Sequence, residues 1–116
     1  MIATAEHPVV LVNTIGRDPA AVDALISLTE AYAMPVVQPV PRYMNFPDSH
    51  PMHHGYEVDA SLRDADLMLL IDCDVPWIPS RQAPRSDCQF IHLGIDPVFS
   101  SLPLRGFPAD VALQTA

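Results

Sequence analysis

Two largely apolar strands, each followed by aspartate, are the clearest pattern along the chain. Leu67–Ile71 is followed by Asp72 and Asp74, and Gln89–Leu93 leads shortly to Asp96. A run without polar alternation is typical of a strand buried on both faces, as in a parallel sheet covered by helices. Because ligands bind at the carboxyl ends of such strands, the three aspartates lie where a nucleotide would be held if one binds.

The rest of the pattern alternates strands with helices and predicts a layered α/β fold. Asp18 fits the N-cap of a helix and Pro19 its first position, and the helix is expected to end near Ala33, before Pro35. The expected strands are 9–13, 36–40, 67–71, 89–93 and 110–114, with a short edge strand near 53–56. Pro39 and Pro41 are expected to make the far end of strand 36–40 irregular. Residues 56–64 are expected to form a short helix and 97–102 a helical turn, while 1–6 resembles the last turn of a helix.

Composition indicates one domain and narrows the class of partner. The chain has 116 residues, which is enough for a single core. Its net charge of −8 argues against nucleic acid or an anionic membrane surface as partner. No apolar run approaches the ~20 residues that span a bilayer, and no secretory signal precedes the first strand. Cys73 and Cys88 lack a metal or redox spacing, so we expect free thiols in a cytoplasmic protein.

Several segments, taken in their order and spacing, resemble one family. They are Pro8–Val12, Leu25–Glu30 with Met34–Val37, Phe46–Pro51 with His54 and Gly55, Ala65–Ile71, and Ile91–Pro97. Together they resemble the central domain of thiamine-diphosphate-dependent enzymes of the acetolactate synthase type. The resemblance runs from about Ile2 to the C-terminus and therefore covers nearly the whole chain.

This resemblance implies a doubly wound, mostly parallel sheet in a Rossmann-like three-layer α/β/α fold, with strand order 3-2-1-4-5-6. Residues 1–116 would be a single central domain, a fragment of a larger enzyme with N- and C-terminal domains as partners, and a homo-oligomer. The parent would be a decarboxylase or carboligase, a lyase or transferase, acting on 2-oxo acids through thiamine diphosphate and Mg²⁺. The family carries its activating glutamate and its Gly-Asp-Gly motif on the other domains. This chain contains no Gly-Asp-Gly, so we expect a structural role and no catalytic residue here.

A nucleotide site is the alternative, and the turn from Asn13 to Asp18 is its candidate. Gly16 and Arg17 could approach a phosphate there, with Asp96 at a neighbouring strand end. The turn has one glycine and lacks the G-x-G-x-x-G fingerprint, and the Asp18 carboxylate would repel phosphate. We therefore favour a plain structural turn over a stand-alone module for FAD or an adenine nucleotide, and expect no bound flavin.

Two polar clusters each have a structural and a functional interpretation. His50, His53 and His54 could ligate zinc, but no thiolate lies nearby in sequence, so solvent-exposed loop histidines are favoured. The aspartate set, which includes Asp87 besides the strand-end residues, could bind Mg²⁺ or do acid–base chemistry. For Asp96, capping of the turn after its strand is favoured.

An apolar surface is expected around four large side chains. They are Trp77, Ile78, Phe99 and Phe107. Such a surface could pack on a neighbouring domain, and in isolation it would promote self-association. A third interpretation is a folded domain that binds no ligand and serves in oligomer contacts.

Overall fold

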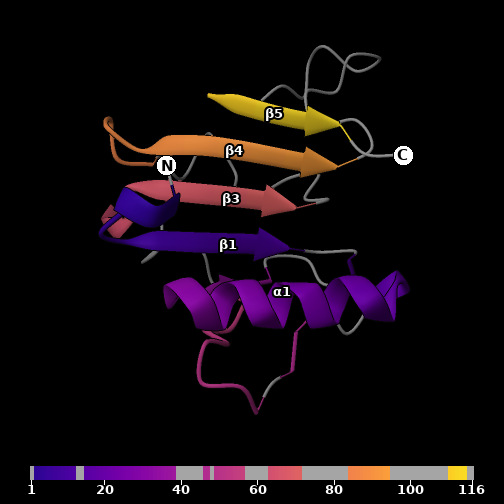
Figure 1. The fold of residues 1–116 in the computed structure, drawn as a ribbon. Coiled ribbons are helices and arrows are strands. Elements are labelled where there is room, and N and C mark those ends of the chain that lie inside the picture. The colour runs from indigo at the N-terminus through magenta and orange to yellow at the C-terminus, as the bar shows by residue number, and fades with distance from the viewer. Residues whose placement is uncertain are drawn as a thin grey trace.

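A parallel five-stranded sheet is the centre of the domain in the computed structural model (Figure 1). The structure describes residues 2–12, 15–38, 46–47, 49–56, 63–71, 84–94 and 110–114. The strands are β1 (Pro8–Val12), β2 (Val36–Val37), β3 (Leu67–Ile71), β4 (Gln89–Gly94) and β5 (Val111–Gln114). Their order across the sheet is β2-β1-β3-β4-β5, and every neighbouring pair is parallel.

A single parallel bridge extends the sheet beyond β2. Val36 pairs with His53, the Val36 amide donates to the Met52 carbonyl at 2.7 Å, and the His54 amide donates to the Val36 carbonyl at 2.8 Å. Gly55 then adopts a φ of +91°, which suits glycine, and its carbonyl accepts from the Gln38 amide. The five strands follow the predicted order 3-2-1-4-5-6 without its third strand, and a single bridge stands where that strand was expected, so the observed order differs slightly from the prediction. The doubly wound α/β class is confirmed.

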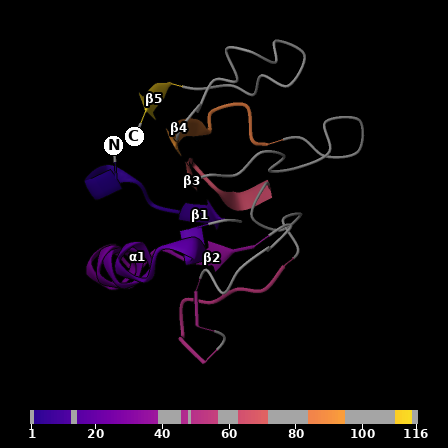
Figure 2. The same cartoon turned by 90° about the vertical axis from the view of Figure 1, so that its right-hand side faces the viewer.

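Helix α1 (Pro19–Tyr32) confirms the expected start and end of the first helix. Asp18 is the N-cap with extended φ and ψ, Pro19 occupies the first turn, and Ala33 ends the helix in the left-handed region at φ 52°. Val22, Leu25 and Thr29 are buried along one side of the helix. Figure 2 shows α1 on one face of the sheet, beside β1 and β2.

The core has two parts because successive side chains of each strand point to opposite faces. One apolar cluster, on the face that α1 covers, contains Val10, Val12, Leu25, Met34, Val36, Phe46, Leu67, Leu69, Ile71 and Ile91. The other contains Val9, Leu11, Val37, Ala65, Met68, Leu70, Cys88 and Phe90. All of β1 and β3 is buried, as the apolar run 67–71 predicted for β3, whereas β4 begins with an exposed Gln89.

Some predicted boundaries differ from the structure. The first strand begins at Pro8, one residue earlier than expected, and β2 stops at Val37, where we expected a strand to residue 40. A proline at position 39 cannot donate to a ladder, which accounts for a short β2. The start of the chain is a 3-10 helix, η1 (Ile2–Thr4). Of the predicted helix 56–64, Arg63 and Asp64 are helical, while 57–62 and the turn at 97–102 lie outside the described residues.

Candidate functional site

The N-terminus of α1 was the candidate for phosphate binding, and its backbone donors are already occupied. The Ala20 amide donates to Oδ1 of Asp18 at 3.1 Å. The amides of Ala21 and Val22 donate to the Asp18 carbonyl at 3.0 and 3.3 Å, and the Asp18 amide donates to the Ile15 carbonyl at 3.1 Å. Pro19 has no amide hydrogen. From residue 18 to residue 22, this segment therefore offers a phosphate no unpaired N–H group.

Of the three predicted site residues, the structure describes Gly16 and Arg17. Gly16 and Arg17 belong to a 3-10 turn, η2 (Ile15–Arg17), between β1 and α1, and Gly16 is partly buried. Asp96 lies outside the described residues. The carboxylate of Asp18 supplies negative charge where a helix N-terminus attracts anions. It therefore occupies the electrostatic position that a phosphate would take.

Of the aspartate set, only Asp87 lies among the described residues. Strand β3 ends at Ile71, and Asp72 and Asp74 lie beyond the described residues, as do Asp96 and the group Trp77, Ile78, Phe99 and Phe107. Asp87 lies before β4, at the amino edge of the sheet, and its grouping with the other three aspartates stays a prediction. Its carboxylate pairs with the Arg85 guanidinium at 2.6 and 2.7 Å. That hydrogen bond holds the pKa of Asp87 below its usual value and raises the pKa of Arg85.

His50 and His53 are not the solvent-exposed loop histidines that we expected. The side chain of His50 is only 14% exposed and contacts Oε1 of Glu30 on α1 at 2.8 Å. Nε2 of His53 lies 2.9 Å from the side-chain amide of Gln38, which is buried. Only His54 is exposed as predicted. Among the described residues no three metal-ligating side chains come together, so the zinc alternative gains no geometric support.

The imidazoles of His50 and His53 bind the backbone in the same way. In each ring Nδ1 accepts from the backbone amide two residues later: Met52 for His50 at 3.1 Å, and Gly55 for His53 at 3.3 Å. The Nε2 proton of His50 then faces Glu30. Phe46 packs between the rings, with centroids 4.8 Å from His50 and 6.5 Å from His53. These histidines fasten residues 46–56 to α1 and β2, which is a structural role.

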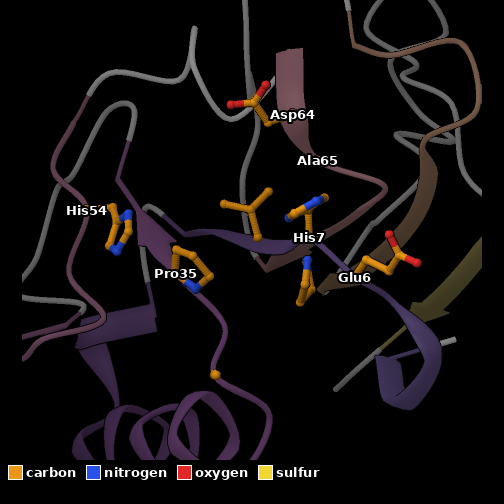
Figure 3. Close-up of a pocket in the computed structure, with 9 residues that line it drawn as sticks. Glu6, His7, Pro35, His54, Asp64 and Ala65 are labelled. Carbon is orange, nitrogen blue, oxygen red and sulfur yellow. The ribbon is translucent and has the colours of Figure 1, made fainter.

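A cavity of about 310 Å³ opens at the amino ends of β1 and β3, opposite the edge where the sequence placed a ligand (Figure 3). Its lining is Glu6, His7, Pro8, Val9, Ala33, Pro35, His54, Asp64 and Ala65. Figure 3 shows His54 on one side and Glu6 on the other, with the Glu6 and Asp64 carboxylates pointing in different directions. The polar groups therefore do not converge on one point, as a catalytic site requires. No sequence signal marked this cavity.

Two aspartates that the sequence analysis overlooked link neighbouring strands at the amino edge. Asp66 accepts the amides of Glu6 and His7 at 2.8 and 2.9 Å. Asp110 accepts the Phe90 amide at 2.7 Å, and its own amide donates to the Phe90 carbonyl. Each aspartate directly precedes a strand, and that position is the signal that could have identified both.

Cys88 is a free thiol, as expected, and it is buried in the second apolar cluster. Burial raises the pKa of Cys88 to about 11. The thiol therefore stays protonated and unreactive at neutral pH. Cys73 lies outside the described residues.

The fold and the α1 turn define the class: a Rossmann-like α/β domain whose first helix is capped by the Asp18 carboxylate. The model of the central domain of thiamine pyrophosphate enzymes matches residues 1–113. The chain belongs to this family, as its central domain. No curated protein matches the chain.

Among solved structures, the domain is similar to a protein from Mycobacterium smegmatis that is provisionally described as a thiamin diphosphate-dependent enzyme. The TM-score is 0.73 at 22% sequence identity, and the match covers 97% of this chain. It covers 23% of that chain, so the present domain spans about a quarter of the protein it resembles. At this identity the likeness supports the fold.

Among the described residues, no helix combines the length and the apolar character needed to cross a membrane.

Proposed function

We propose that this chain is the structural central domain of a cytoplasmic, acetolactate synthase-like enzyme that uses thiamine diphosphate and Mg²⁺ on 2-oxo acids. The family match supports the cofactor class of the parent. The parent's chemistry would belong to the cofactor, held by flanking N- and C-terminal domains. In this proposal the domain supplies a rigid sheet between those domains and no catalytic side chain.

One observation carries the structural role: the amide groups at the N-terminus of α1 are all paired within the chain. The amides of Ala20, Ala21 and Val22 are saturated by Asp18, whose carboxylate also repels anions. Phosphate binding at a helix N-terminus needs free N–H groups and an uncompensated positive end of the helix dipole. The competing function, an FAD or adenine-nucleotide module built on Gly16, Arg17 and Asp96, would have to bind without them.

Titration of ADP, followed at the Ala20 and Ala21 amides by NMR, tests this function. In the wild-type chain we expect no saturable shift of either amide. Asp18→Gly should let both amides respond, because it removes the carboxylate and frees the Ala20 amide, while glycine still serves as an N-cap at a cost of a few tenths of a kcal/mol.

Two further variants separate the effect of the Asp18 charge from the effect of freeing the Ala20 amide. Asp18→Asn removes the charge but keeps an oxygen for the Ala20 amide, and it should behave like the wild type. Asp23→Asn removes a charge at an exposed position on the same helix and serves as the control. Micromolar binding of ADP or FAD by the wild-type chain would contradict the structural role and support the nucleotide module.

A test of the proposed substrate class requires the complete polypeptide. We expect it to consume pyruvate or another 2-oxo acid only when thiamine diphosphate and Mg²⁺ are both present. Consumption that is independent of thiamine diphosphate would contradict the proposal.

A further inference from the structure

The outer side of β2 is covered by residues 49–56, which we call the β2 strap. The Val36 amide donates to the Met52 carbonyl at 2.7 Å, and the Gln38 amide donates to the Gly55 carbonyl at 3.0 Å. An edge strand has a row of backbone groups that lack partners unless another segment supplies them. The strap supplies these partners to β2.

Cavities adjoin both ends of the β2 strap. His54 lines the amino-edge cavity of about 310 Å³ (Figure 3). A second cavity, of about 360 Å³, lies between the other end of the strap and the last turn of α1, lined by Thr29, Glu30, Ala33, His50, Pro51 and Met52. Because open space adjoins both ends, the position of the strap depends strongly on its polar contacts.

The imidazoles of His50 and His53 can hold the strap only while Nδ1 carries no proton. Nδ1 accepts from the Met52 amide in His50 and from the Gly55 amide in His53. A neutral imidazole that accepts at Nδ1 carries its proton on Nε2, whereas a charged imidazole carries a proton on both nitrogens. Proton uptake therefore turns each Nδ1 acceptor into a donor that faces another donor, and both backbone contacts are lost.

A carboxylate faces His50 and partly opposes this effect. Nε2 of His50 lies 2.8 Å from Oε1 of Glu30 on α1, and a carboxylate at this distance favours the charged imidazole. The Glu30 side chain is 60% exposed, so solvent screens the attraction. We therefore expect the His50 end of the strap to stay close to α1 when His50 takes up a proton.

The groups described around His53 come from three segments. They are the uncharged side-chain amide of Gln38, the Phe46 ring and the ring of Tyr56. Phenols such as that of Tyr56 stay neutral at and below neutral pH. Whatever else His53 contacts, a proton on its Nδ1 removes the acceptor of the Gly55 amide. The His53 end of the strap is therefore the end that should open first.

We propose that the β2 strap is a pH-sensitive device, in which proton uptake by His50 and His53 releases the strap from the edge of β2. The closed strap requires neutral imidazoles, so protons bind preferentially to the open form and acidification shifts the equilibrium towards it. Histidine side chains change charge between about pH 5 and 8, so release falls in that range. Release exposes the edge of β2 and moves His54, which lines the amino-edge cavity. The inference does not depend on the proposed enzymatic role of the parent.

Hydrogen exchange of the 116-residue chain, followed by NMR, tests the device. After correction for intrinsic exchange rates, local opening at the Val36 and Gln38 amides should rise about tenfold or more between about pH 7.5 and about pH 5, because one proton shifts an equilibrium by up to tenfold per pH unit. The Val10 amide, which donates to the Pro35 carbonyl between β1 and β2, should keep its protection.

The double variant His50→Asn with His53→Asn separates proton uptake from the loss of the acceptor. An asparagine side chain also accepts from the backbone amide two residues later, but it takes up no proton. This variant should form the strap and lose the pH response. His54→Asn is the matched control, because His54 is exposed and its replacement removes one imidazole from the same segment. The control should respond to pH like the wild type.

Nitrogen chemical shifts of the imidazole rings give a second measurement that needs no variant. In the wild type Nδ1 of His50 and of His53 should be unprotonated at neutral pH and should gain a proton as the strap opens. A proton on either Nδ1 at neutral pH would overturn the proposal. Opening that is independent of pH, or a pH response that persists in the double variant, would overturn it too. So would an equal loss of protection at the Val10 amide, because acid would then unfold the sheet and not release the strap.

Discussion

Phe46→Ala should destabilise the domain by about 3–5 kcal/mol, which is a large share of a typical total stability of ~5–15 kcal/mol. Phe46 is 1% exposed and belongs to the cluster that lies between α1 and the sheet. Its removal leaves a cavity and also takes away the ring that packs against His50 and His53. Both losses act on the segment that forms the bridge to β2.

Urea denaturation measures this effect, and Tyr32→Ala is the control. The side chain of Tyr32 is about half exposed, so its truncation should change the free energy of unfolding by less than about 1 kcal/mol. In Phe46→Ala the His54 amide, which donates to the Val36 carbonyl, should also exchange with solvent faster. A stability within about 1 kcal/mol of the wild type would show that Phe46 is not part of the core.

The second large effect is expected at Asp66, and it depends on pH. Burial alone would raise the pKa of Asp66, but hydrogen bonds from the Glu6 and His7 amides outweigh it and lower the pKa below the ordinary 3.8. A carboxyl group whose pKa is lower in the folded chain contributes stability above its unfolded pKa. That contribution is lost as the pH falls through the folded value, which here lies below 3.8.

Asp66→Asn should therefore cost about 1 kcal/mol at pH 7, and the gap to the wild type should narrow as the pH drops below about 4. Hydrogen bonds to charged groups are worth up to about 3 kcal/mol, but solvent screens a carboxylate that is this accessible. Urea denaturation at neutral and acidic pH gives the gap, with Asp23→Asn as the control variant. A gap that stays constant from pH 7 to acid would show that the Asp66 charge does not stabilise the fold.

The sequence was sufficient to predict the central elements because their signals are local. Leu67–Ile71 is a strand in the structure with the predicted bounds, because a short, unbroken apolar run suits a strand buried on both faces. Asp18 and Pro19 predicted the start of α1 because capping depends on immediate neighbours. The strand order came from the family resemblance, and the structure differs from it in having a single bridge at His53 in place of a third strand.

The roles of the polar side chains were harder to predict because they depend on partners far away in the sequence. Asp66 binds amides about sixty residues earlier, and its position directly before a strand does not reveal which amides those are. His50 and His53 looked like exposed loop residues because Glu30 and Gln38, which hold them, come from α1 and from beside β2. The turn before α1 was predictable in part. Its sequence predicted the cap, and the structure adds that the cap occupies the remaining donors.

Calorimetric titration of thiamine diphosphate and Mg²⁺ into the isolated 116-residue chain tests the central claim most directly. The account assigns cofactor binding to the flanking domains of a thiamine pyrophosphate enzyme and a structural role to this domain. It therefore predicts no saturable heat, with or without Mg²⁺. Micromolar binding that requires Mg²⁺ would contradict it, because the central domain would then hold the cofactor by itself.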